Sequence, residues 1–147
     1  MNGRDTLDAI FRDTRTIAVV GLSPKPWRES FGVARALQGF GYRIVPVNPN
    51  ADTILGETVY RSLTDAAREH RIDCVNIFRN SEDVPPVVDE AIAIGAKSVW
   101  MQVGIEHPAA AAKAEAAGLR VVQDACIKVE RACWTPRRTP SPSSAEP

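Results

Sequence analysis

The segment from residue 21 to residue 32, Gly-Leu-Ser-Pro-Lys-Pro-Trp-Arg-Glu-Ser-Phe-Gly, carries the residues best suited to hold an anion. It joins a predicted buried strand to a predicted helix. Gly21 permits a tight turn, and the N-terminus of the following helix presents unpaired N–H groups. The side chains add two hydroxyls and two cations: Ser23, Ser30, Lys25 and Arg28. The segment predicts a site for the phosphates of a nucleotide-type ligand; the alternative is a proline-stiffened surface loop.

The second predicted strand, Arg43–Asn48, ends in Asn48-Pro-Asn50, where a binder of NAD usually places an acid on the ribose hydroxyls. An acid would repel a phosphorylated ribose, whereas Asn48 would not. The glycine fingerprint G-x-G-x-x-G of dinucleotide binders is also missing from the sequence. The pattern therefore favours a ligand with a phosphate on or near the ribose, such as NADP or coenzyme A.

Three further candidates follow later strands. Phe78 and Arg79 end the third strand, and Arg79 is interpreted equally well as a ligand-binding cation or a surface charge. Gln102 could bond a ligand or hold the next loop. Cys126 could act as a nucleophile only beside a base or in an electropositive setting. The sequence ties neither histidine to it, so a partly buried apolar role is the plainer hypothesis. No spacing typical of a metal site or a catalytic triad is present.

The elements that position these residues alternate along the chain. Apolar runs predict five strands, at 16–20, 43–48, 73–78, 97–102 and 120–123. An amphipathic helix is predicted before the first strand, at 5–12, and a second helix after it, with Ser30 as its N-cap. Further helices are predicted at 64–70, 84–94, 108–117 and 126–132.

This alternation predicts an α/β fold: a Rossmann-like, doubly wound parallel sheet of about five strands in three layers. We expect one domain over residues 1–134 and a disordered tail rich in proline and serine over 135–147. We also expect the strand order 3-2-1-4-5, with the ligand beyond the carboxyl ends of the strands, where the order reverses between strands one and four.

Composition narrows the partners. The 147 residues hold 18 basic and 18 acidic side chains, so no general field attracts nucleic acid or an anionic membrane. No apolar run approaches the roughly 20 residues that span a bilayer. The three cysteines form no disulfide pattern, and residues 1–15 do not read as a signal peptide. We therefore expect a cytoplasmic monomer or homodimer that binds a small molecule.

Five stretches in one order resemble a known family: IAVVGLSPKP from Ile17, VPVNP from Val45, VNIFR from Val75, SVWMQVGI from Ser98 and VVQDAC from Val121. They are similar to the small stand-alone coenzyme A-binding domain proteins, which are related to the N-terminal domain of the succinyl-CoA synthetase α subunit. The resemblance implies coenzyme A binding, with the pyrophosphate at 21–30, the adenosine end near 48–50 and the cleft lined by 78–80. It also places Cys126 at the cleft, where a mixed disulfide with the coenzyme A thiol could form.

The synthetase relatives continue into a domain with a phosphorylated histidine, which this sequence does not contain. We therefore expect a non-catalytic coenzyme A-binding protein. Three alternatives stay open: an NADP-dependent oxidoreductase, a partner-dependent subunit in acyl-CoA chemistry, and an interaction module with a vestigial site.

Overall fold

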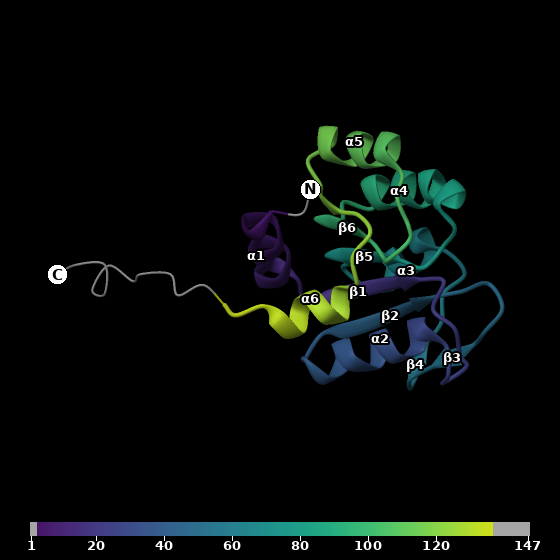
Figure 1. Ribbon diagram of the computed structural model, residues 1–147. Coiled ribbons are helices and arrows are strands. Elements are labelled where there is room, and N and C mark those ends of the chain that lie inside the picture. The colour runs from purple at the N-terminus through teal and green to yellow at the C-terminus, as the bar shows by residue number, and fades with distance from the viewer. Residues whose placement is uncertain (1–2, 137–147) are drawn as a thin grey trace.

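The computed structural model describes residues 3–136 (Figure 1). In its first half the elements are α1 (Arg4–Asp13), β1 (Thr16–Val20), α2 (Glu29–Gly39), β2 (Arg43–Val47), β3 (Thr53–Ile54), β4 (Glu57–Thr58) and α3 (Leu63–Glu69). In its second half they are β5 (Cys74–Ile77), η1 (Ser81–Asp83), α4 (Val84–Ala93), β6 (Ser98–Met101), α5 (Pro108–Ala116), β7 (Arg120–Val122) and α6 (Ile127–Cys133). Of the predicted tail, residues 137–147 lie outside the described part.

The five long strands form one parallel sheet in the order β2-β1-β5-β6-β7, which confirms the predicted α/β class. The predicted strand order is wrong. The third long strand, β5, pairs with β1, with Ile17 opposite Cys74, and does not lie outside β2. The strand order therefore reverses between β1 and β5, and the loops after these two strands flank the crevice.

Pro46 gives the physical reason for this order. Its carbonyl oxygen accepts the N–H of Tyr60 at 3.0 Å, and the N–H of Asn48 donates to the carbonyl oxygen of Tyr60 at 2.9 Å, both on the side of β2 that faces away from β1. Pro46 has no N–H to offer on that side, so β2 cannot accept a full neighbouring strand there. β2 is an edge strand, and β5 pairs on the other side of β1.

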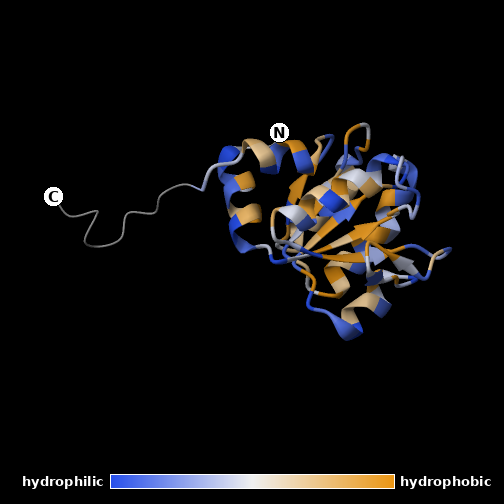
Figure 2. Cartoon of the chain, turned by 90° about the horizontal axis from the view of Figure 1, so that it is seen from below, coloured by the Kyte–Doolittle hydropathy of each residue, from blue (hydrophilic) through white to orange (hydrophobic). Residues whose placement is uncertain are grey.

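Two apolar cores lie on the two faces of the sheet, and Figure 2 shows the apolar strands between the helices. Helices α3, α4 and α5 cover one face through side chains such as Leu63, Val88 and Ala111. Helices α1, α2 and α6 cover the other, where Trp100 is fully buried and its indole N–H donates to the carbonyl oxygen of Ala125 at 2.8 Å. The continuous apolar runs of the strands thus fit burial on both faces, as the sequence predicts.

The hairpin of β3 and β4 falls in a stretch with only turn signals in the sequence. Leu55 and Gly56 connect the two strands with φ of 54° and 76°, and positive φ at both positions is the mark of a tight hairpin turn. Over residues 3–136, every helix is too short or too polar to cross a membrane.

Candidate functional site

The ends of β1, β2 and β5 open into a pocket of about 380 Å³, which we call the edge pocket. It lies at the reversal of strand order, where open α/β sheets bind their ligands. It is lined by Gly21, Ser23, Arg28, Glu29, Ser30, Asn48 and Phe78. Six of these seven are predicted site residues. Sequence reasoning missed Glu29, although its place between Arg28 and Ser30 was a signal for it.

Gly21 brings the ends of three strands together. Its N–H donates to the carbonyl oxygen of Val47 at 2.9 Å, and its φ is 89°, a conformation that L side chains rarely adopt. A β-carbon at this position would lie 2.3 Å from the carbonyl oxygen of Phe78. The sequence predicts a close backbone approach at Gly21, and the group that approaches it in the structure is the carbonyl of Phe78.

Hydroxyl groups brace the loop between Gly21 and α2. The Ser30 hydroxyl accepts the N–H of Ser23 at 3.0 Å, and the Ser23 hydroxyl accepts the N–H of Lys25 at 3.1 Å. The prediction of Ser30 as the N-cap is wrong, because α2 begins at Glu29 with Arg28 at the cap and Ser30 is already helical. The bond from Ser23 turns Ser30 toward the loop. Each hydroxyl still has a proton to donate to a ligand.

The cations of the loop differ in position. Arg28 lines the edge pocket, whereas Lys25 lies outside it, with its ammonium 5.9 Å from the centre of the Trp27 ring. The Trp27 side chain is 77% exposed. Among residues 3–136 neither cation forms an ion pair. The loop thus offers cations without an ion-pair partner and hydroxyl donors, which together can hold an oxyanion, although the acidic Glu29 lines the same pocket.

Asn48 positions the loop through its side-chain amide. Its Nδ2 donates to the carbonyl oxygen of Leu22 at 2.8 Å, and its Oδ1 accepts the N–H of Asn50 at 2.8 Å. Asn48 therefore ties the end of β2 to the loop after β1 while it adds no negative charge. Asn50 is exposed and does not line the edge pocket.

Arg79, Gln102 and Cys126 are not brought into the edge pocket. Gln102 is 2% exposed, and its Oε1 accepts from Asn76 Nδ2 at 3.1 Å and from the N–H of Ile127 at 3.0 Å. Its side chain thus holds the start of α6, which is neither of the two roles predicted for it. Arg79 is partly exposed, and Cys126 is half-buried at the residue before α6.

Asn76 was not among the predicted site residues, and it lies fully buried in β5. A single amide among apolar residues in the run 74–77 was the available signal. Asn76 Oδ1 and Gln102 Nε2 have no hydrogen-bond partner among residues 3–136. Within the described residues no three metal-binding side chains gather in one place.

The pattern of the family described as CoA binding domain matches residues 15–132. The chain is 41% identical over 123 residues to Uncharacterized protein YneT of Bacillus subtilis, covering 84% of this chain and 90% of that protein. It superimposes with a TM-score of 0.82 on a hypothetical protein from Pyrococcus horikoshii, at 34% identity, over 87% of this chain and 89% of the other.

A larger enzyme shares the same region. The chain is 30% identical over 97 residues to the ADP-forming acetate–CoA ligase of Methanocaldococcus jannaschii, which corresponds to 66% of this chain and 14% of the ligase. The ligase is thus matched over a small part of its length, and small relatives are matched over nearly all of theirs. From the family match over most of its length, this chain belongs to the CoA-binding domain family.

Proposed function

We propose that this chain binds coenzyme A or an acyl-CoA in the edge pocket and acts without catalysis of its own. The observation that carries the proposal is the coincidence of the family match with Arg28, which has no ion-pair partner among residues 3–136, at the reversal of strand order. A diphosphate is bound by positive charge, hydroxyl donors and backbone N–H groups that approach it closely, and the loop after β1 supplies all three.

Different residues bind different parts of the ligand. Arg28 and the hydroxyls of Ser23 and Ser30 face the pyrophosphate, with Lys25 reaching it from the exposed side of the loop. The ribose phosphate lies near the turn at 48–50, where the neutral Asn48 does not repel it. This preference for a phosphorylated ribose separates coenzyme A and NADP from NAD, and the family separates coenzyme A from NADP.

The environment of the histidines favours a non-catalytic role. His70 Nε2 is bonded to the Tyr60 hydroxyl at 3.1 Å, and His107 Nδ1 accepts the N–H of Ala110 at 3.1 Å as the cap of α5. Both imidazoles therefore serve local structure, and neither bonds Cys126. The three free thiols, Cys74, Cys126 and Cys133, suit a reducing cytoplasm.

Thermal unfolding with coenzyme A, dephospho-coenzyme A, NADP and ATP tests the proposal. A ligand at about 100 times its Kd adds about 2.7 kcal/mol of stability. Coenzyme A should raise Tm by several degrees, and the Lys25→Ala/Arg28→Ala variant should lose this shift while keeping its own Tm. The control is Arg120→Ala/Lys128→Ala, which removes the same charges at exposed positions outside the edge pocket and should keep the shift.

Two results would overturn the proposal. A shift with NADP and none with coenzyme A would assign the site to a dinucleotide and revive an oxidoreductase. No shift with any of the four ligands would leave an interaction module with a vestigial site.

The similarity to the acetate–CoA ligase supports a second candidate, a subunit that needs a partner for acyl-CoA chemistry. Co-purification of the tagged chain with a larger protein that carries a phosphorylated histidine would favour it. A solitary monomer or homodimer with full affinity for coenzyme A would favour the stand-alone role.

A further inference from the structure

A second pocket, of about 350 Å³, opens at the opposite edge of the sheet from the loop after β1. We call it the arginine pocket. It lies where the chain enters β1 and β2, beside the ends of α1 and α6. Among the residues that the structure describes, three cations line it, Arg12, Arg15 and Arg131, and no acidic side chain does. Because the whole chain has no net charge, this is a local concentration of positive charge.

Aromatic rings hold Arg131 in place. Its guanidinium carbon lies 4.7 Å from the ring centre of Phe40, 5.5 Å from that of Tyr42 and 5.0 Å from that of Trp134. Its Nε donates to the Tyr42 hydroxyl at 2.8 Å. Stacked in this way, the planar group is pre-organised, and its two terminal nitrogens remain available for a fork-shaped contact with an oxyanion. Burial raises the pKa of Tyr42, so its hydroxyl keeps a proton to donate.

Arg15 is held by its backbone and leaves its side chain available. Its N–H donates to the Asp73 carboxylate at 3.0 Å, and its carbonyl oxygen accepts the N–H of Arg43 at 2.9 Å. Its side chain is exposed and has no ion pair in the described part of the chain. The second carboxylate oxygen of Asp73 lies 3.6 Å from Lys97, so this acid does not neutralise the pocket.

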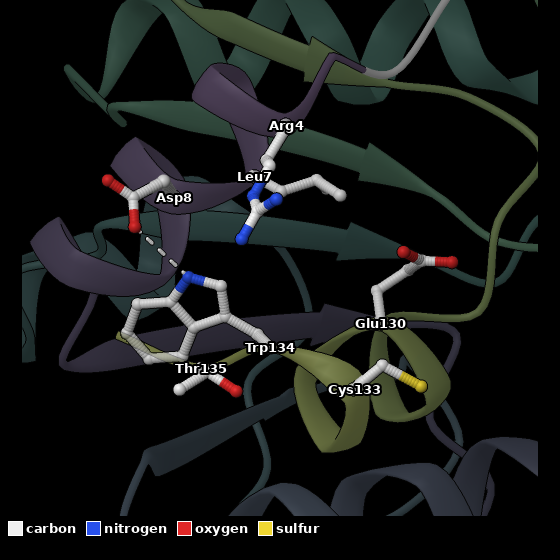
Figure 3. A pocket seen from close by; sticks show the side chains of 7 residues that line it. All are labelled: Arg4, Leu7, Asp8, Glu130, Cys133, Trp134 and Thr135. Carbon is white, nitrogen blue, oxygen red and sulfur yellow. Dashed lines mark hydrogen bonds between the residues drawn. The ribbon is translucent and has the colours of Figure 1, made fainter. Parts of the chain in front are cut away.

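Asp8 lies 3.3 Å from Arg12 and accepts the Trp134 indole N–H at 3.2 Å. Figure 3 shows this bond, with Trp134 from the end of α6 pointing toward Asp8 on α1. Trp134 lines both the arginine pocket and the neighbouring cavity of Figure 3. That cavity mixes Arg4 with acids, and the arginine pocket does not.

The geometry points to the arginine pocket as a binding site for the phosphate or carboxylate group of a small organic anion, separate from the edge pocket. Arg15 and Arg131 supply the charge-assisted hydrogen bonds, and the exposed part of the Phe40 ring provides apolar contact for the rest of the molecule. Charge-assisted hydrogen bonds of this kind are roughly twice as strong as those between neutral groups, and bidentate pairing with a planar guanidinium adds geometric specificity.

The test uses the full chain, labelled with ¹⁵N, and two probes at constant ionic strength: inorganic pyrophosphate and citrate. We expect saturable shifts of the Gly41 and Tyr42 amide signals and of the side-chain Nε–H of Arg15. Arg15→Gln should weaken binding about tenfold, the loss of one charged hydrogen-bonding group, and should fold because only its backbone is used. The matched control, Arg120→Gln, removes a charge from the same sheet edge outside the pocket and should leave binding unchanged.

A response to pyrophosphate alone assigns a phosphate, a response to citrate alone assigns a carboxylate, and either supports the site. Equal weakening of binding by Arg15→Gln and Arg120→Gln would mean that only the overall charge of the protein matters, and it would overturn the proposed site. Shifts that disappear only in Lys25→Ala/Arg28→Ala would place the anion in the edge pocket and overturn it as well. Failure of coenzyme A binding leaves this site unaffected, since the two pockets share no residue.

Discussion

A β-carbon on Gly21 would lie 2.3 Å from the carbonyl oxygen of Phe78, which is closer than such atoms ever approach. The absence of a side chain at Gly21 therefore allows the end of β1 to lie against the end of β5. These two strands are the ones between which the strand order reverses. The edge pocket thus depends on one glycine as much as on its charged side chains.

Gly21→Ala should destabilise the fold. The φ of 89° costs about 1 to 2 kcal/mol for an L residue, and the contact with Phe78 adds about 1 to 3 kcal/mol. In urea unfolding, the free energy of unfolding of Gly21→Ala should fall by the sum of these two costs. Gly118→Ala is the matched control, because its φ is 93° and nothing lies within 4 Å of the added carbon. If both variants lose the same free energy, backbone conformation alone matters and the contact with Phe78 does not.

Asn48→Asp should weaken the loop and the binding of coenzyme A together. The amide that donates to the Leu22 carbonyl oxygen would become a carboxylate that faces it, at a cost of about 1 to 3 kcal/mol. The new charge should also reduce affinity for coenzyme A more than for dephospho-coenzyme A, which calorimetric titration can compare. Asn50→Asp, at an exposed neighbour, should do neither. Equal losses for the two ligands would move the ribose phosphate away from residue 48.

Gln102→Met should be costly although it keeps the shape of the side chain. It leaves the buried N–H of Ile127 without its partner and leaves Asn76 Nδ2 with only its 3.4 Å bond to the Trp100 carbonyl oxygen, at about 2 kcal/mol or more in urea unfolding. Gln38→Met is the control, because Gln38 makes one long bond of 3.4 Å at a half-buried position. A similar loss in both variants would argue against the network at Gln102.

The three thiols should differ sharply in reactivity. Burial raises the pKa of Cys74 to about 12, so its thiol stays protonated and hidden at pH 8. A thiol reagent should label the exposed Cys133 and the half-buried Cys126 in the native protein, and Cys74 only in denaturant. Labelling of Cys74 at the rate of Cys133 would contradict its burial.

Cys74 also predicts how stability depends on pH. The unfolded thiol loses its proton near the ordinary pKa of 9.0, while the folded thiol keeps it to about 12. Stability from this group is complete below pH 9 and falls as pH rises through this window, since the unfolded state then binds fewer protons. Urea midpoints at pH 8, 9 and 10 should fall less steeply for Cys74→Ala. Parallel curves for the two proteins would exclude the effect.

The sequence predicted the elements well because local signals determine them. Apolar runs gave all five long strands, and Gly41 and Gly118 marked the ends of α2 and α5, with φ of 100° and 93°. Even the edge position of β2 was encoded, since Pro46 cannot donate on its outer side. The predicted strand order did not use this signal.

The loop after β1 was predicted from the sequence by itself, because glycine, hydroxyls and cations are readable without coordinates. Only the tertiary structure decided how those residues are used. It placed Arg28 in the pocket and Lys25 outside it, turned Asn48 into a brace, and buried Gln102 under α6. It also brought Arg15 and Arg131, 116 positions apart, to one edge. Spacing along a chain sets what lies on one face of a helix or strand, but contacts between distant segments depend on strand order and packing, which no local pattern contains.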